Sequence, residues 1–359
     1  MKTKLIMKSW IQGLFILLSV IIVSCDKDNK EEPPPSTNYS DGVFIINEGL
    51  FNTGTGTISF MKSDGSGLLN KIYQQANNSI PLGNIVQSMN KIDDKVFVLV
   101  NNDDKVEIVN SANFRRIKTL NNITYPAYII QADSNKAYIS CWDKKLVIVS
   151  LHSLEVVGSV NTGTGPTKML KTNDHVWALN QGGLGLDSTI SVVDVSTDEV
   201  AQTIQVYPRP TGIQKDKNGN IWIMCSGRGT WHGEASEGHL LCVNPQDYSI
   251  IQDFEFPGSA QQPEKLIINS DGDILYYNYP GGIYKFEISS LELETQAFIP
   301  YNGTFYGLGF DIVDNVIYSS DAIDYVQNGL VFKFNATSGE MIDSFNTGIV
   351  PSEFHFSLP

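Results

Sequence analysis

The strongest constraint on the fold is a five-residue apolar run that recurs seven times along the chain. The copies occupy residues 43–47, 96–100, 137–141, 176–180, 221–225, 274–278 and 316–320. Each copy is rich in Val, Ile, Tyr, Phe or Trp and is bounded by turn residues, a pattern typical of β-strands. Their first residues lie 53, 41, 39, 45, 53 and 42 positions apart. This spacing is typical of four-stranded propeller blades, and no long stretch has helical periodicity.

Three further strands accompany each copy. A run that opens with Pro or Gly precedes it, as in residues 126–130. A second apolar strand follows it, as in residues 190–194, and a fourth comes after that, as in residues 200–204. Four strands in this order form one blade, so the sequence predicts an all-β, seven-bladed β-propeller.

The two ends of the repeat predict how the ring closes. The first copy, at residues 43–47, has no strand before it, whereas the last unit is followed by an extra strand at residues 351–356. We therefore expect the C-terminal strand to complete the first blade, which removes both open sheet edges. Residues 40–359 then form the propeller, with 320 residues or about 46 per blade.

The first residues have the pattern of an export signal. Three lysines precede an apolar run at residues 11–23, which ends at Ser24-Cys25. This order is typical of a secretory signal, and the run is shorter than the roughly 20 residues of a membrane span. Residues 22–25 resemble the lipobox of bacterial lipoproteins, which implies removal of residues 1–24 and lipidation of Cys25. The alternative is an ordinary cleaved signal followed by an unmodified cysteine.

Residues 25–39 are predicted to be a disordered tether, because they are charged and proline-rich. Their first acidic residues resemble the export signal that sends Bacteroidetes lipoproteins to the outer face of the outer membrane. The resemblance implies a lipid-anchored protein that faces the cell exterior. Three internal cysteines, Cys141, Cys225 and Cys242, lie in or beside apolar stretches and are expected to be buried free thiols.

The charge of the chain excludes one class of partner. The sequence has 25 Lys and Arg against 39 Asp and Glu, a formal charge of -14. Without residues 1–24 three lysines are lost, and the charge becomes 22 - 39 = -17. Nucleic-acid binding requires cations that neutralise phosphates, so no nucleic-acid partner is expected.

Loop lengths predict which face of the propeller binds a ligand. The turns between the first and second strands of each blade are short, whereas several loops after the second strand are long and aromatic. Loops on a rigid scaffold are where binding residues concentrate. The predicted ligand-binding residues are Phe51, Tyr128, Trp142, Lys168, Arg209, Arg228, Trp231, His232, Tyr279, Tyr306 and Tyr325. Residues that lead into the inner strands, Gln262, Glu264, Lys265 and Glu353, point to the same rim. Four strand aromatics, Tyr138, Trp177, Trp222 and Tyr276, are expected to belong to the core.

Catalytic motifs are weak. The five histidines do not cluster along the sequence, and no nucleophile elbow, phosphate loop or dinucleotide fingerprint is present. Oxygen-bearing residues end several strands, namely Asn47, Glu48, Asn180, Asn278 and Asp321, and such ligands suit calcium. We interpret the chain as a binding protein without a cofactor, and a calcium-dependent hydrolase similar to propeller lactonases as an alternative.

Three segments in one repeat carry a family resemblance: V-W-A-L-N at residues 176–180, I-S-V-V-D at 190–194 and V-A-Q-T-I-Q-V-Y-P-R-P at 200–210. They resemble the surface-layer or YncE-like propeller family. The lipoprotein architecture resembles its Bacteroidetes branch, which includes BtuG-like cobalamin-capturing lipoproteins. This resemblance implies capture of a small-molecule nutrient, a corrinoid such as cobalamin, and its transfer to a TonB-dependent outer-membrane transporter. An adhesion or scaffolding propeller that binds protein or glycan is the other alternative.

Overall fold

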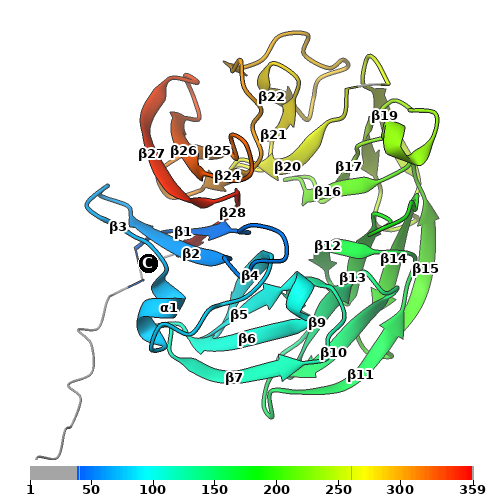
Figure 1. Cartoon of the computed structure of the whole chain (residues 1–359). Coiled ribbons are helices and arrows are strands. Elements are labelled where there is room, and N and C mark those ends of the chain that lie inside the picture. The colour runs from blue at the N-terminus through cyan, green and yellow to red at the C-terminus, as the bar shows by residue number, and fades with distance from the viewer. Residues whose placement is uncertain (1–38, 40, 260, 358–359) are drawn as a thin grey trace, which may run out of the picture. The chain divides into compact units, whose positions relative to one another are not determined.

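Seven four-stranded antiparallel sheets surround a central axis in the computed structural model of the chain (Figure 1). The structure describes residues 39, 41–259 and 261–357. The predicted signal, the lipidation site Cys25 and nearly all of the predicted tether lie outside these residues. Among the described residues, no helix has the length and apolar character to cross a membrane.

Each sheet forms one blade, and we number the blades from the N-terminus and give their strands from the axis outward. Blade 1 contains β28 (Pro351–Ser357), β1 (Gly42–Asn47), β2 (Thr57–Lys62) and β3 (Leu68–Leu69). Blade 2 contains β4 (Val86–Ile92), β5 (Lys95–Val100), β6 (Lys105–Asn110) and β7 (Arg116–Asn121). Blade 3 contains β8 (Pro126–Gln131), β9 (Lys136–Cys141), β10 (Lys145–Ser150) and β11 (Glu155–Asn161). Blade 4 contains β12 (Pro166–Thr172), β13 (His175–Asn180), β14 (Thr189–Asp194) and β15 (Glu199–Gln205).

The remaining blades follow the same order. Blade 5 contains β16 (Pro210–Lys215), β17 (Ile221–Cys225), β18 (His239–Val243) and β19 (Ile250–Glu255). Blade 6 contains β20 (Glu264–Ile268), β21 (Ile274–Tyr279), β22 (Gly282–Glu287) and β23 (Ile299–Pro300). Blade 7 contains β24 (Leu308–Asp311), β25 (Val316–Asp321), β26 (Asn328–Asn335) and β27 (Met341–Ile349). Within the described part of the chain, three short helical segments lie in loops: α1 (Ile72–Ala76) and the 3-10 turns η1 (Asn101–Asp103) and η2 (Thr230–His232).

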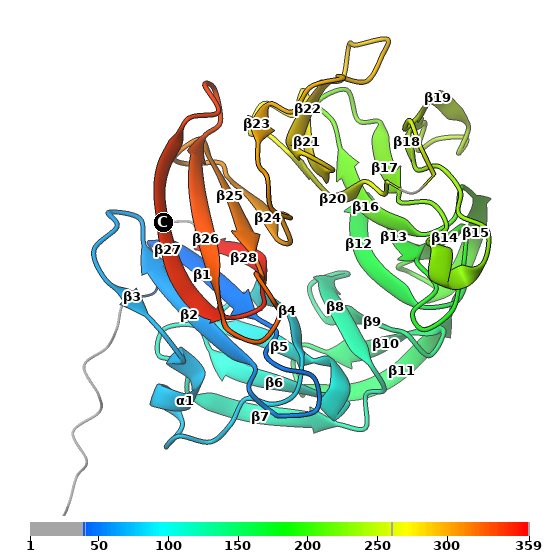
Figure 2. The same cartoon turned by 45° about the horizontal axis from the view of Figure 1, so that its top comes forward.

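The C-terminal strand closes the ring as the sequence predicted. β28 pairs antiparallel with β1, with Phe354 opposite Ile45 and Phe356 opposite Val43. Figure 2 shows this last strand beside the first one. The fold is therefore a closed seven-bladed β-propeller, and the seven recurring runs form its second strands.

Apolar side chains fill the spaces between neighbouring blades. The four aromatics expected in the core, Tyr138, Trp177, Trp222 and Tyr276, are at most 2% exposed. Because burial of large rings supplies much of the stability of such a fold, these positions need no functional explanation. The three described cysteines are free and buried, and burial raises the pKa of the Cys141 thiol to about 12.

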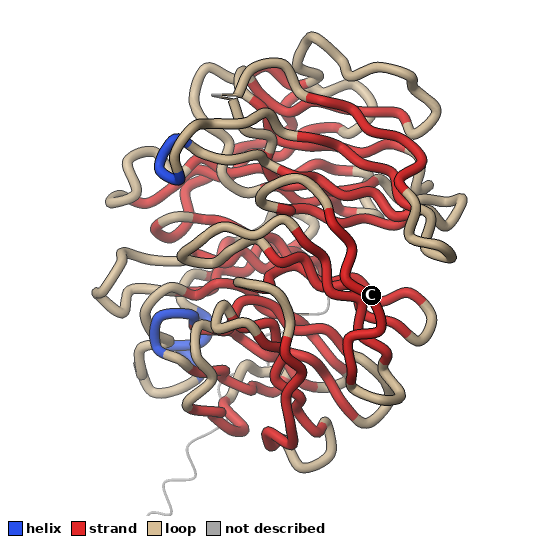
Figure 3. Tube along the Cα trace, turned by 90° about the vertical axis from the view of Figure 1, so that its right-hand side faces the viewer, coloured by secondary structure: helices blue, strands red, loops and turns tan. Residues whose placement is uncertain are grey.

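The two faces of the propeller differ, as loop lengths predicted. Figure 3 shows the ring from its side, with loops at both ends of the strands. On one face, tight turns join the first two strands of a blade, and Asp93 and Asn173 adopt left-handed backbone angles there, with φ of 53° and 51°. Asx residues tolerate this conformation, so these turns have a local structural explanation. The opposite face carries the longer loops and the site described next.

Candidate functional site

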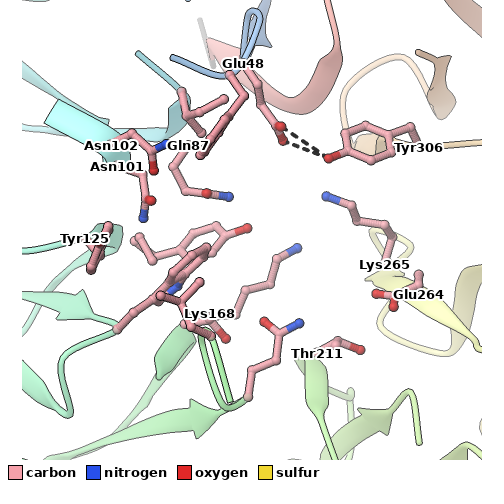
Figure 4. A pocket seen from close by; sticks show the side chains of 18 of the residues that line it. Glu48, Gln87, Asn101, Asn102, Tyr125, Lys168, Thr211, Glu264, Lys265 and Tyr306 are labelled. Carbon is pink, nitrogen blue, oxygen red and sulfur yellow. Dashed lines mark hydrogen bonds between the residues drawn. The ribbon is translucent and has the colours of Figure 1, made fainter. Parts of the chain in front are cut away.

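A cavity of about 910 Å³ opens around the propeller axis on the long-loop face. Side chains from all seven blades or their connecting loops line it. In Figure 4 labelled side chains such as Glu48, Lys265 and Tyr306 point toward its centre. Its polar walls are formed by Glu48, Asn52, Gln87, Asn101, Asn102, Thr167, Lys168, Gln181, Thr211, Glu264, Lys265 and Thr304. Its apolar and aromatic walls are formed by Phe51, Ile85, Tyr125, Ala127, Tyr128, Trp142, Leu184, Trp231, Phe305, Tyr306 and Tyr325.

The inner strands direct their first side chains toward the axis by means of register shifts. In blades 2 to 6 the pairing of the inner strand with its neighbour is irregular at the second or third residue. A bulge of this kind turns a side chain away from its regular direction. The residues within these shifts include the cavity residues Gln87, Ala127, Lys168, Thr211 and Lys265. Local irregularity therefore builds the cavity floor.

A buried ion cluster lies at this floor, around Glu353 of the closing strand β28. One carboxylate oxygen of Glu353 lies 3.2 Å from Lys265 Nζ and 3.5 Å from Lys168 Nζ, and it accepts a hydrogen bond of 2.8 Å from the Tyr128 hydroxyl. Burial alone would raise the pKa of Glu353, but the two ammonium groups lower it to about 2. The carboxylate is therefore ionised and joins blades 1, 3, 4 and 6.

Two titratable groups beside this cluster are disfavoured in their charged forms. Burial raises the pKa of Glu48. The Tyr306 hydroxyl donates a shared hydrogen bond to its carboxylate and lies 3.2 Å from each oxygen (Figure 4). Burial lowers the pKa of His355 to about 4, so its imidazole is neutral at pH 7. The cavity floor thus combines a strong local ion pair with an environment that penalises uncompensated charge.

Exposed rings and apolar side chains surround the mouth of the cavity. Trp231 is 68% exposed, Phe51 69%, Leu184 79% and Tyr325 51%. Tyr125 stacks near Trp142 with a centroid distance of 6.1 Å, and Tyr306 meets Tyr325 edge-on at 5.6 Å. These side chains come from blades 1, 3, 4, 5 and 7 or the loops beside them. Solvent-exposed rings around a concave site indicate a surface that covers a ligand or partner.

Seven of the eleven predicted ligand-binding residues line this cavity: Phe51, Tyr128, Trp142, Lys168, Trp231, Tyr306 and Tyr325. Arg209 lies behind the wall, with its guanidinium 5.2 Å from the ring centre of Trp231 and hydrogen-bonded to Gln262 and Glu264. A ligand contact by any of these residues stays a prediction.

The three other predicted residues lie outside the cavity wall. His232 is a neighbour of Trp231 in η2, with 5.9 Å between ring centres. Arg228 lines a separate, shallower depression with Tyr207 and His239. Tyr279 packs against Phe256, and its hydroxyl donates to the carbonyl of Pro257 at 2.5 Å.

Several cavity residues were missed because strand patterns do not identify them. Gln87, Tyr125, Asn101 and Asn102 line the wall, and none of them lies in a long loop. The backbone conformation, rather than the sequence, marks Tyr125 among these residues. Tyr125 and Arg209 each precede the proline that begins an inner strand, and both adopt left-handed angles, with φ of 47° and 58°. Such a conformation is uncommon outside glycine and asparagine and often marks functional positions.

Two of the residues considered as calcium ligands, Asn47 and Asn180, use their amide N–H groups within their own blades, whereas the Oδ1 atoms of Asn180 and Asn278 accept no hydrogen bond from a described residue. The Asn47 amide donates to Thr57 and Ser59 within blade 1. The Asn180 amide makes the same kind of bonds to Thr189 and Ser191 of blade 4. Within the described ranges, no group of three or more His, Cys, Asp or Glu side chains is placed to hold a metal ion. These asparagines therefore have a structural explanation as links between strands of one blade.

Solved structures share this fold at low sequence identity. A functionally unknown protein from Desulfotomaculum acetoxidans is 12% identical, with a TM-score of 0.68 over 89% of this chain and 100% of the other. A quinonprotein alcohol dehydrogenase-like protein from Bacteroides thetaiotaomicron is 15% identical, with a TM-score of 0.66 over 89% and 79% of the two chains. Kuenenia stuttgartiensis hydrazine synthase is 10% identical, with a TM-score of 0.57 over 72% and 85%.

These likenesses establish the propeller fold alone, since propellers support many unrelated activities. No curated protein sequence matches the chain. One protein-family profile does match, over residues 41–356, which is nearly all of the propeller. The chain therefore belongs to the family described as domain of unknown function, DUF5074.

Proposed function

We propose that this protein binds a large, flat ligand with polar edges in the axial cavity and does not act on it chemically. The observation that supports this most strongly is the convergence of aromatic rings from separate blades on one cavity of about 910 Å³. That volume lies at the upper end of the range of small-molecule sites, roughly 300–1,000 Å³. Flat rings can cover such a ligand at low cost in side-chain entropy.

The arrangement of polar and apolar groups also favours this ligand class. Amide side chains of Gln87, Asn102 and Gln181 line the walls, while Trp231 and Phe51 stand exposed at the mouth. A ligand that reaches both levels would hydrogen-bond inside the cavity and contact rings above it. This explains why the mouth keeps apolar side chains in water, which is otherwise unfavourable.

Our specific proposal for the ligand is a corrinoid such as cobalamin. It rests on the resemblance of the repeat and of the N-terminal segment to cobalamin-capturing surface lipoproteins, and the size of the cavity is compatible with it. We further propose that Cys25 anchors the protein to the outer membrane, facing the exterior, and that a TonB-dependent transporter receives the ligand. The exposed rim of Phe51, Leu184, Trp231 and Tyr325 would lie between the ligand and that partner.

Calorimetric titration of the purified protein with cobalamin tests the proposal. We expect saturable binding that Trp231→Ala weakens about tenfold or more, because truncated aromatic hot spots commonly cost over 1 kcal/mol. A matched pair of variants separates the cavity from the general surface. Leu184→Ala, at the mouth, should weaken binding severalfold, whereas Leu291→Ala, with an 87% exposed side chain away from the cavity, should leave it unchanged. Heat equal to the dilution baseline would reject cobalamin.

The exposed apolar rim also favours a second function, adhesion to a protein or glycan. The two functions differ in what competes for the rim. If the rim binds a macromolecule directly, cobalamin should not displace it and the deep residues Gln87 and Lys168 should not matter for its affinity. If the protein captures a nutrient, a detergent-solubilised TonB-dependent barrel should co-purify with it, and Leu184→Ala should weaken that association.

A further inference from the structure

We infer that the ligand of the axial cavity carries an anionic group, a carboxylate or a phosphate, and that Lys168 is the residue that binds it. This inference rests on the proposed function and specifies the chemistry of the ligand at the cavity floor. The structure supports it through the position of Lys168, through the charges around it and through the neutral donors beside it.

Lys168 presents an incompletely used ammonium group to the cavity. It lies in the irregular part of β12, and its side chain points into the cavity (Figure 4). Its single ion pair among the described residues is the 3.5 Å contact with Glu353, at the outer limit of hydrogen-bond distance. The ring centre of Tyr128 lies 5.7 Å away. An ammonium group has three N–H donors, so capacity for a ligand oxygen remains.

Glu353 has a second cationic partner that lies closer to it than Lys168 does. The same carboxylate oxygen lies closer to Lys265 Nζ, at 3.2 Å, and accepts the 2.8 Å hydrogen bond from Tyr128. Lys265 also donates to the carbonyl of Ser352 at 3.2 Å, so its ammonium is better satisfied. One buried carboxylate is therefore shared by two ammonium groups, and Lys168 is the less compensated of the two.

The other carboxylates at the cavity are committed elsewhere or disfavoured as anions. Glu264 is 3.2 Å from the guanidinium of Arg209 and forms an ion pair with it. Glu48 is hydrogen-bonded to Tyr306, and burial raises its pKa, which favours the neutral acid. An incoming anion would thus meet an ammonium group whose charge the protein balances only in part.

Neutral donors line the same cavity as Lys168 and could complete an anion site. The side chains of Gln87 and Gln181 line the cavity, and each carries an amide N–H group that can donate to a ligand oxygen. The indole Nε1 of Trp142 is buried and has no hydrogen-bond partner among the described residues. A buried N–H without a partner is costly, so a ligand oxygen that accepts from it would recover that loss.

The ionisation of Lys168 is consistent with this assignment. Burial lowers the pKa of its ammonium, and the negative charge of Glu353 opposes that effect only in part. A bound anion would stabilise the charged form further.

Two pairs of flat aromatic probes test the inference, each with an anionic and a neutral member. Flavin mononucleotide and riboflavin differ by a phosphate, and 1-pyrenebutyrate and 1-pyrenebutanol differ by a carboxylate. In fluorescence titrations we expect the anionic member of at least one pair to bind about tenfold or more tightly than the neutral member. If the anionic member is preferred only in the flavin pair, the site binds a phosphate. If it is preferred only in the pyrene pair, the site binds a carboxylate.

Variants assign the preference to Lys168. Lys168→Met should reduce the difference in affinity between the anionic and the neutral member of a pair to within about twofold. An unchanged affinity for the neutral member would show that the cavity is intact. Lys168→Arg should restore most of the ratio. The control Lys217→Met removes a lysine on the short-turn face, which pairs with Asp273 at 3.0 Å, and should change nothing.

Three outcomes would overturn the inference: equal affinity within both pairs, no binding by either anionic probe, or a preference that survives in Lys168→Met. These results are distinct from a failure of the proposed function. That function fails if cobalamin and all four probes bind independently of Trp231 and Leu184. If the affinity of the probes does not depend on their charge but still requires Trp231 and Leu184, the proposed binding function stands. Only the inference of an anionic group is then rejected.

Discussion

At the scale of single residues, Glu353 and its partners connect stability with the site. Glu353 lies on the last strand, yet its carboxylate holds Lys265 of blade 6, Lys168 of blade 4 and Tyr128 of blade 3. Breaking a buried pair leaves uncompensated charge, which typically costs 3–5 kcal/mol. The same group that places Lys168 in the cavity therefore also stabilises the inner ring.

Replacing Glu353 should destabilise the protein far more than replacing an exposed acid. We expect Glu353→Gln to lower the free energy of unfolding by about 3 kcal/mol, because two ammonium groups then lack their carboxylate. The control Asp273→Asn removes the partner of Lys217 at the surface and should cost under about 1 kcal/mol. Urea unfolding at pH 7 measures both. Equal costs for the two variants would contradict the assigned role of the cluster.

His355 should make stability depend on pH between about 4 and 6.5. Burial lowers its pKa from 6.5 to about 4, and its Nε2 has no partner among the described residues. The unfolded chain binds this proton more readily than the folded protein does. The contribution of His355 to the free energy of unfolding is therefore fully present above pH 6.5 and declines as the pH falls toward 4. The full effect is at most about 3.5 kcal/mol, from a difference of about 2.5 pKa units at roughly 1.4 kcal/mol per unit.

The variant His355→Gln isolates this contribution. It should flatten the loss of stability between pH 7 and pH 4.5 relative to the unmodified protein, as followed by urea unfolding at each pH. Glu48 has a raised pKa and acts in the opposite direction as the pH falls, so the comparison between the two proteins is the relevant quantity. Parallel pH profiles would show that His355 is not the titrating group.

At the scale of elements, β28 determines whether the ring closes. It supplies the inner strand of blade 1, and Phe354 is buried against Tyr318 of blade 7 with 5.7 Å between ring centres. Without this strand, β1 would present an open edge, which favours association with other chains. The closing strand also carries Glu353, so the integrity of the site depends on it.

Truncating Phe354 should therefore be costly. We expect Phe354→Ala to lower the free energy of unfolding by about 3–5 kcal/mol, the range for a buried phenylalanine. Phe356→Ala, on the same strand at a half-buried position, should cost less. Urea unfolding again gives both values. Both rings contact Tyr318, at 5.7 and 5.4 Å, so a reversed order would show that burial of Phe354 is not the main contribution to closure.

The strands and their order can be predicted from the sequence more completely than the residues that line the cavity. The seven runs, the blade order and the closing strand follow from periodicity, which depends on burial and is visible along the chain. The cavity floor depends instead on register shifts at residues such as Gln87 and Thr211, which line the cavity. No composition or spacing signal specifies such a shift. Aromatics in long loops, such as Trp231 and Tyr325, were identified because strand packing could not explain them.

At the scale of the whole molecule, the propeller brings distant segments to one mouth. Phe51 and Tyr325 are separated by most of the chain, yet both line the same cavity. A ligand at the axis should therefore affect all of these loops together, whereas a ligand on one blade would affect one loop. We therefore expect a concerted response of the loops on the long-loop face.

Hydrogen–deuterium exchange in the presence and absence of saturating cobalamin can detect this response. We expect reduced exchange in peptides from residues 48–56, 181–187, 226–236 and 322–327 together, with no change in the short turns of the opposite face. Protection confined to a single blade, or protection of the short-turn face, would contradict it.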